Sequence, residues 1–175
     1  YILFGLSTLS PLSFIGALLH IVSHSFIKNT LFMSAGAIIH ETERTRADEL
    51  TGIGKVMPKV MIVFTIVSLG LIGIPPTGGF ISKWYLAEGA LNLNGAASWI
   101  GPAVLLCSAL MTAGYLLTIT IHGFFPGENA VIEGHEAPRA MWIPMLVLAL
   151  LSVLVGLFPN TLIGFIQTII SAIFT

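Results

Sequence analysis

The stretch LSFIGALLHIVSHSFIKNTLFMSAGAII, residues 12–39, decides the fold class. It exceeds the roughly 20 apolar residues that a helix needs to cross a bilayer core of about 30 Å. The rest of the chain is similar in kind, because 55% of all residues are apolar and only 9% are charged. Soluble domains carry about 25% charged residues, and so few charges cannot cover a surface that faces water. The sequence therefore predicts an all-α, multi-pass integral membrane protein.

The charge balance and the cysteine count exclude several other classes. Seven Lys and Arg against eight Asp and Glu leave no basic surplus for binding nucleic acid. A disordered chain would need low hydrophobicity and high charge. The single cysteine, Cys107, cannot supply the several thiolates of an iron–sulfur cluster. We expect no cofactor, no metal site, and no redox or hydrolytic chemistry in this chain.

Further apolar segments outline one transmembrane helix bundle over residues 1–175. Because the chain starts inside an apolar run, we expect it to be the C-terminal half-channel of a longer protein. The short segment 161–174 is open to three interpretations: an interfacial helix, a tilted half-span, or a helix packed on its neighbours. The predicted spans are residues 1–10 (partial), 12–39, 58–92, 99–125 and 141–158.

The distribution of cations favours a single crossing by residues 58–92. If this segment crosses once, the loop cations all fall on one side of the membrane, as the positive-inside rule requires. If it crosses twice, one of them moves to the other side. These loop cations are Arg44, Arg46, Lys55, Lys59 and Arg139.

A single crossing by residues 58–92 requires a break in the helix. A continuous helix of this length would measure about 52 Å at 1.5 Å per residue, far more than the membrane needs. Pro75 and Pro76 supply the break, because each lacks an N–H group and clashes with the carbonyl four residues earlier. The carbonyls affected are those of Leu71 and Ile72.

The two glycines after the prolines, Gly78 and Gly79, then allow almost any turn. The segment IPPTGGFISK, residues 74–83, therefore predicts a discontinuous membrane helix. Unwound backbone at membrane depth survives only inside protein or beside a water-filled cavity.

Three polar residues lie on one face of the helix predicted over residues 12–39. At 100° per residue, His20, His24 and Lys28 fall within roughly 80° of one another and form a stripe about 12 Å tall. An ammonium at the centre of a membrane helix costs about 2.5 to 3.5 kcal/mol, which favours a functional role for Lys28. Since histidine titrates near neutrality, the stripe can accept and release protons. The alternatives are a snorkelling lysine and histidines that bond neighbouring helices.

Lys83 follows the predicted break by one or two turns. A helix that ends near Ile74 leaves unpaired carbonyls, equivalent to about half a negative charge. Such ends coordinate cations in discontinuous transporter helices, so we expect Lys83 to face the break. The alternatives are an interfacial lysine beside Trp84 and an ion pair with Glu88.

The arrangement resembles a known family. HIVSHSFIKNTLFMSAGAIIH, residues 20–40, is similar to the His-x-x-x-His-x-x-x-Lys helix of the antiporter-like family. That family comprises the proton-pumping subunits of complex I, membrane-bound hydrogenase subunits, and the large subunits of multi-subunit Na⁺/H⁺ antiporters. GIGKVMP and GIPPTGGFISKWYL, residues 52–58 and 73–86, resemble its second signature. The resemblance extends over about residues 1–158, and the closing segment looks most like the D subunit of the Na⁺/H⁺ antiporters.

The resemblance implies translocation of protons, or of protons coupled to Na⁺, through a mid-membrane Lys/His axis. His20, His24 and Lys28 match the central axis of the family, and Lys83 matches its terminal proton-channel residue. We expect a subunit of a multi-subunit cation/proton antiporter in a prokaryotic cell membrane, with other membrane subunits, the lipid bilayer and these ions as partners. The alternatives are a proton-pumping subunit of NADH:quinone oxidoreductase or of a membrane-bound hydrogenase, and a scaffold subunit that transports nothing.

Overall fold

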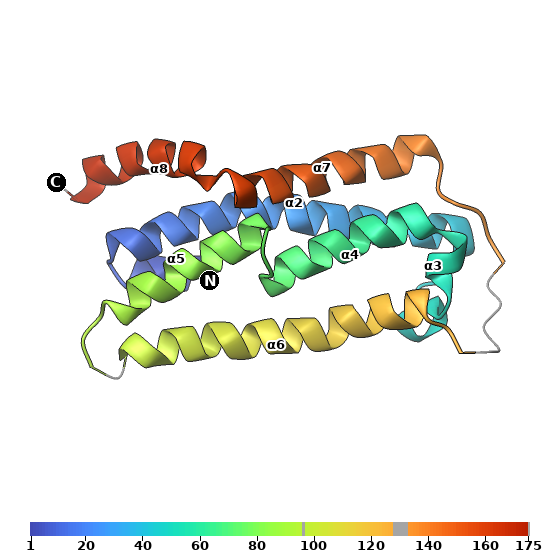
Figure 1. Ribbon diagram of the computed structural model, residues 1–175, viewed down its shortest axis with the longest axis horizontal. Coiled ribbons are helices and arrows are strands. Elements are labelled where there is room, and N and C mark those ends of the chain that lie inside the picture. Colours follow the sequence, from blue (N-terminus) through green and yellow to red (C-terminus); the bar gives the residue numbers. More distant parts are fainter. Residues whose placement is uncertain (96, 128–132, 175) are drawn as a thin grey trace.

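The computed structural model describes residues 1–95, 97–127 and 133–174 (Figure 1). It is 82% helical, and these described residues contain no strand, so the predicted all-α class is confirmed. The elements are α1 (Ile2–Ser7), α2 (Pro11–Thr42), η1 (Ala47–Leu50), α3 (Ile53–Val56), α4 (Pro58–Ile72), α5 (Gly78–Leu91), α6 (Ala97–Phe124), α7 (Arg139–Leu157) and α8 (Pro159–Phe174).

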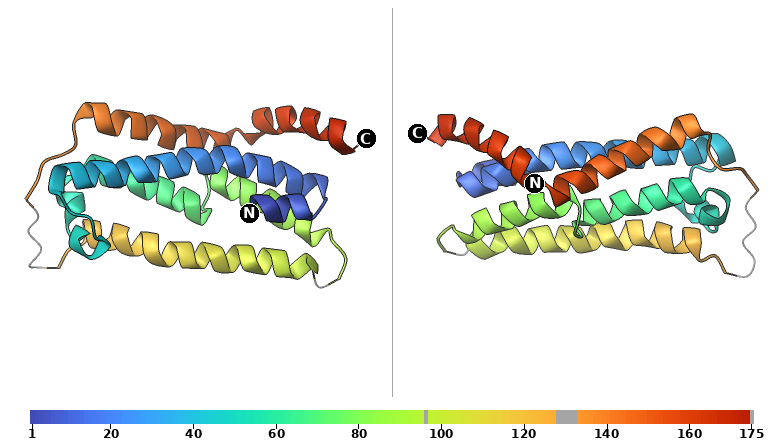
Figure 2. Two further views of the ribbon diagram at one scale, coloured as in Figure 1. Left: turned by 180° about the vertical axis from the view of Figure 1, so that it is seen from behind. Right: turned by 45° about the horizontal axis from the view of Figure 1, so that its top comes forward.

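Helix α2 is the central element of the bundle and contacts α4, α5, α7 and α8. It has 32 residues and is therefore about 48 Å long. Helices α4 and α5 follow one another back along α2, and α6 lies beside them on the far side from α7 (Figures 1 and 2). Three helical stretches are long and apolar enough to cross a membrane: Pro11–Thr42, Ser98–Phe124 and Arg139–Leu157.

The outer faces of α6 and α7 carry large apolar side chains that nothing in the described chain covers. Met111 on α6 is 76% exposed, and Leu150 on α7 is 52% exposed. A helix that is apolar all round is stable where lipid or another membrane subunit, and not water, meets its outer face.

The predicted helix break lies between α4 and α5. Helix α4 ends at Ile72, where Gly73 takes the left-handed conformation with φ 96° and its N–H donates to Leu69 O at 3.0 Å. Pro75 and Pro76 both lie in the non-helical link that follows, and α5 begins at Gly78. The break at Pro75-Pro76 is therefore confirmed, and α4 and α5 together run from one end of the bundle to the other (Figure 1).

The two glycines after the prolines differ from their predicted role as a flexible turn. Gly78 and Gly79 form the first turn of α5, and the residue that needs the left-handed conformation is Gly73. The reason is close packing: a Cβ at Gly79 would overlap the backbone oxygen of Gly70, and a Cβ at Gly78 would lie 3.2 Å from Ser152 O. A Cβ at Gly156 of α7 would similarly overlap the link.

This packing predicts that Gly79→Ala prevents α5 from approaching α4. The new methyl group meets backbone on the opposing side, so we expect a loss of about 3 kcal/mol or more, the upper end of the range for overpacked cores. The matched control is Gly36→Ala in α2, because a Cβ there meets nothing within 4 Å. Thermal unfolding of the detergent-solubilised full-length protein measures both. Equal midpoints for the two variants would contradict this packing.

Helix α8 contains the short apolar segment 161–174. It continues along the bundle after α7 (Figure 2) and packs against α2. Ile163, Ile166 and Ile170 of α8 form a buried cluster with Ile15 and Leu19 of α2. Of the three interpretations, this placement agrees with a helix packed on its neighbours.

The cationic loops meet at one end of the bundle, where α2 ends and α7 begins (Figure 1). Glu136 Oε2 accepts a hydrogen bond of 2.8 Å from the Lys59 backbone N–H and so caps the N-terminus of α4. The Lys59 ammonium lies 5.1 Å from the ring centre of Trp142. This gathering agrees with the single crossing inferred from the loop charges.

Candidate functional site

Lys83 of α5 binds the C-terminal end of α4. Its Nζ donates hydrogen bonds of 2.7 Å to Leu71 O and of 2.7 Å to Ile72 O. These are the two carbonyls that the prolines, four residues later, deprive of helical partners. The negative end of the α4 dipole therefore faces the ammonium, as we expected from the sequence.

Gly73 makes room for this contact. A Cβ at Gly73 would lie 2.9 Å from Lys83 Cδ and 3.3 Å from Nζ, so a larger residue would push the lysine off the carbonyls. The positive φ at Gly73 also favours glycine over any L-residue. Gly73 is thus part of the lysine site and not only a helix terminator.

The ammonium of Lys83 is satisfied by carbonyls and not by a carboxylate. The ion pairs in the described ranges are His40–Glu41 and Arg46–Asp48, so Glu88 is not the partner of Lys83. Lys83 is half-buried and borders an open groove of about 210 Å³ between α5 and α6. The side chains of Phe80, Trp84 and Pro102 also border this groove.

His20 of α2 reaches α5 at the residue before Lys83. It is 5% exposed, and its Nδ1 lies 2.9 Å from Ser82 Oγ. Ser82 Oγ also bonds Gly79 O at 3.0 Å. His20 Nδ1 is therefore paired with a hydroxyl that also bonds the backbone of α5, and which of the two groups donates depends on the tautomer of the imidazole ring.

The remaining members of the stripe continue along α2. The ring centres of His20 and His24 are 5.2 Å apart, and Lys28 follows one turn beyond His24. Lys28 is half-buried and makes no hydrogen bond or ion pair within the described part of the chain. The structure thus brings His20 to the Lys83 site, while Lys28 lies at the other end of the stripe.

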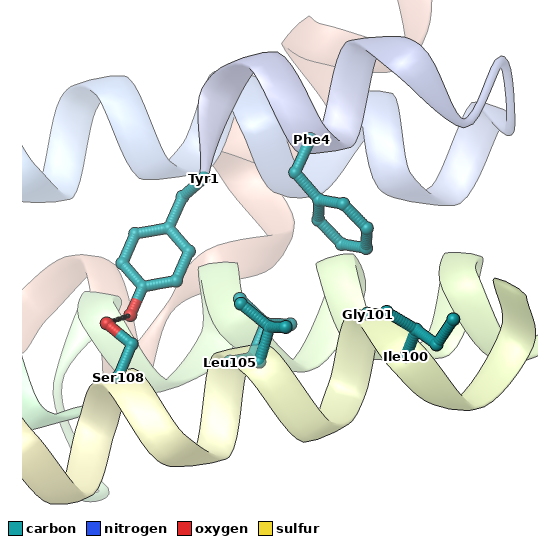
Figure 3. A pocket seen from close by; sticks show the side chains of 7 residues that line it. Tyr1, Phe4, Ile100, Gly101, Leu105 and Ser108 are labelled. Carbon is teal, nitrogen blue, oxygen red and sulfur yellow. Dashed lines mark hydrogen bonds between the residues drawn. The ribbon is translucent and has the colours of Figure 1, made fainter.

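Tyr1 is a site residue that the sequence analysis did not identify. The Lys83 ammonium lies over its ring, 5.2 Å from the centre, and the ring meets His20 edge-on at 4.9 Å between centres. Its hydroxyl donates a hydrogen bond of 2.6 Å to Ser108 Oγ of α6 (Figure 3). No motif marks Tyr1, whereas Gly73 before two prolines is a recognisable helix-terminating signal.

The arrangement is a series of titratable and hydroxyl groups that runs from Lys28 through His24 and His20 to Lys83. Over the ranges that the structure describes, no three His, Cys, Asp or Glu side chains are grouped as metal ligands would be. The chemistry that this site offers is the binding and transfer of protons or cations.

Residues 1–112 match the protein family described as NADH:quinone oxidoreductase/Mrp antiporter, TM, and this match covers more than half of the chain. The chain belongs to this family. The resemblance found in the sequence motifs is therefore confirmed, and this member of the NADH:quinone oxidoreductase/Mrp antiporter family is a multi-pass integral membrane protein.

Two curated relatives are subunits of different kinds of membrane complex. NADH-quinone oxidoreductase subunit N of Desulforudis audaxviator is 39% identical over 94% of this chain and 35% of that protein. The D subunit of the Na⁺/H⁺ antiporter of Bacillus subtilis is 32% identical over 89% of this chain and 31% of that protein. The chain thus spans about a third of the length of these relatives. The expected special likeness to the antiporter D subunit is not supported, since the oxidoreductase relative is more similar.

The fold has a solved counterpart. A chain in the structure of the Mrp complex from Dietzia sp. DQ12-45-1b superimposes with a TM-score of 0.83 and 23% identity. The match covers 96% of this family member and 39% of that chain. At this identity the likeness shows the overall fold alone.

Proposed function

We propose that this segment moves protons across the membrane along a polar axis formed by Lys28, His24, His20 and Lys83. The observation that carries the proposal is the position of Lys83. Its ammonium binds the carbonyl end of a broken helix, and the ring of Tyr1 contacts both this ammonium and the buried His20. A lysine with a purely structural role would require these carbonyls, but it would not require a row of titratable side chains beside it.

Charge coupling between neighbouring groups can pass a proton onward. Two unit charges roughly 5–10 Å apart interact by about 1.7 to 3.3 kcal/mol at an effective dielectric constant near 20. Since 1.36 kcal/mol corresponds to a tenfold change in proton affinity, protonation of one group lowers the affinity of the next by more than tenfold. A proton that arrives at Lys28 thereby favours release further along the axis.

Lys83 exchanges protons with one side of the membrane. In its charged form it makes two charge-assisted hydrogen bonds to α4, and these weaken when the amine becomes neutral. The groove between α5 and α6 reaches the same side chain. Lys83 therefore alternates between two states. The charged ammonium is bound to the α4 carbonyls, whereas the neutral amine is held less tightly and can take up a proton through the groove.

The driving reaction belongs to other subunits of a membrane complex. The higher identity to an NADH-quinone oxidoreductase subunit N favours a redox-driven proton pump, and the likeness to the D subunit of a Na⁺/H⁺ antiporter supports cation/proton antiport as the second candidate. The similar fold in a solved Mrp complex supports assembly with further membrane subunits.

Proton flux in vesicles that contain the full-length protein in its native complex distinguishes the candidates. A redox-driven pump acidifies or alkalinises the lumen when the electron donor of the complex is added, whether or not Na⁺ is present. An antiporter responds to a Na⁺ gradient without an electron donor. A lumen pH that changes under neither condition would contradict the proposal. The remaining alternative would then be a scaffold subunit that transports nothing.

A further inference from the structure

Tyr1 brings four helices together at the Lys83 site. It lies at the start of α1, its ring contacts His20 of α2 and the ammonium of Lys83 on α5, and its hydroxyl binds Ser108 of α6. Figure 3 shows the tyrosine reaching from α1 to the serine on α6. Among the groups described above, Tyr1 alone contacts both titratable side chains at this end of the axis.

We infer that Tyr1 is the positioning residue of Lys83, an inference that rests on the proposed function. Its ring holds the ammonium on the carbonyls of Leu71 and Ile72, and its hydroxyl holds the ring in place through Ser108. Removal of the ring leaves the two carbonyls as the contacts that hold Lys83, so the side chain leaves the end of α4 more often, and it loses the aromatic contact shared with His20.

The contact between ring and ammonium suits a holding role. An ammonium over an aromatic face is attracted by the ring quadrupole, and the attraction grows where water is excluded. The carbonyls of α4 and the ring of Tyr1 both attract the same Nζ. Both contacts favour the charged form, so together they keep the side chain in one place until it releases its proton.

The hydroxyl gives the ring a fixed orientation. The ring forms one end of a groove of about 330 Å³ between α1 and α6, and Tyr1 is 36% exposed. Without an anchor, a ring at the edge of an open groove could rotate about its side-chain bonds. The hydrogen bond of 2.6 Å to Ser108 Oγ prevents this movement, because Ser108 belongs to the long helix α6.

Phe4 offers a matched control on the same helix. It lies one turn after Tyr1 and borders the same groove (Figure 3). Its ring packs on Gly101 of α6 and makes no ring contact or cation–π contact with His20 or Lys83 in the described residues. A Phe4→Leu variant therefore loses aromatic packing between α1 and α6 without touching the site.

The test compares Tyr1→Leu, Tyr1→Phe and Phe4→Leu in the full-length protein within its complex. Proton flux into vesicles is measured, and the labelling of Lys83 by the amine-arylating reagent fluorodinitrobenzene is quantified by mass spectrometry. We expect Tyr1→Leu to lower flux about tenfold and to raise Lys83 labelling about tenfold, with Lys28 labelling unchanged. Tyr1→Phe keeps the ring but loses the hydrogen bond to Ser108, so its flux and labelling should fall between those of Tyr1→Leu and those of the natural protein. Phe4→Leu should remain within about threefold of the natural protein.

Several results would overturn the inference. The first is unchanged flux and labelling in Tyr1→Leu. The second is an equal loss of flux in Phe4→Leu and Tyr1→Leu, which would indicate that Tyr1 acts through packing alone. If Tyr1→Leu does not assemble, Tyr1→Met, which keeps more of the volume, takes its place under the same criteria. A Lys83→Ala variant measured in parallel separates the two proposals. If it transports normally, the proposed function fails, whereas its failure beside an unaffected Tyr1→Leu refutes only the role of Tyr1.

Discussion

Replacement of Lys83 by methionine is expected to reduce proton flux to the level of empty vesicles. Methionine fills a similar volume but carries no proton and cannot donate to the end of α4. The variant also leaves Leu71 O and Ile72 O without the donors that bind them now, at about 1–3 kcal/mol for each buried group. A fall in the unfolding midpoint should therefore accompany the loss of flux.

Lys83→Arg separates these two effects. The guanidinium offers five N–H donors and can satisfy the same carbonyls, but it stays protonated in proteins and so cannot release a proton. We expect this variant to recover most of the thermal stability and none of the flux. Normal flux in Lys83→Arg would mean that Lys83 is a structural cap of α4 and nothing more.

Replacement of Lys28 by alanine is expected to abolish flux without a loss of stability. Lys28 makes no hydrogen bond or ion pair with any described residue, so no bond is broken in the variant. Removal of an ammonium from a membrane helix relieves a cost of about 2.5 to 3.5 kcal/mol. The unfolding midpoint of Lys28→Ala should equal or exceed that of the natural protein, whereas that of Lys83→Met falls.

Lys55→Ala is the control for loss of a positive charge. Lys55 is exposed on α3, at the end of the bundle where the cationic loops meet. Its removal should leave flux unchanged. If Lys28→Ala and Lys55→Ala transport equally well, the stripe on α2 is not part of the path.

The fold class, the helix break and the contact of Lys83 with it could be predicted from the sequence because their causes are local. Two adjacent prolines end a helix wherever it lies. Their positions also identify the two carbonyls, four residues earlier, that lose their helical N–H donors. A lysine one or two turns later is within reach of those carbonyls. The stripe of His20, His24 and Lys28 is local in the same sense, because one helix carries all three.

The rest of the site depends on packing between helices that are distant in sequence. Tyr1 matters only because α1, α2, α5 and α6 meet around it, and no sequence pattern predicts that these helices pack together there. The sequence prediction for Gly79 is wrong for the same reason, because the constraint on this residue is the backbone of Gly70 on α4 and not a turn. A sequence pattern can mark a position as glycine, but it does not show which residue of another helix packs against that position.

Proton flux by the full-length complex in which both Lys28 and Lys83 are replaced by alanine is the decisive measurement. If Lys28 and Lys83 are successive stations of one path, Lys28→Ala/Lys83→Ala shows the same background flux as either single variant, while Lys55→Ala in the same preparation retains the full rate. Flux at the natural rate in the double variant would contradict the account, because protons would then cross without the axis on which it depends.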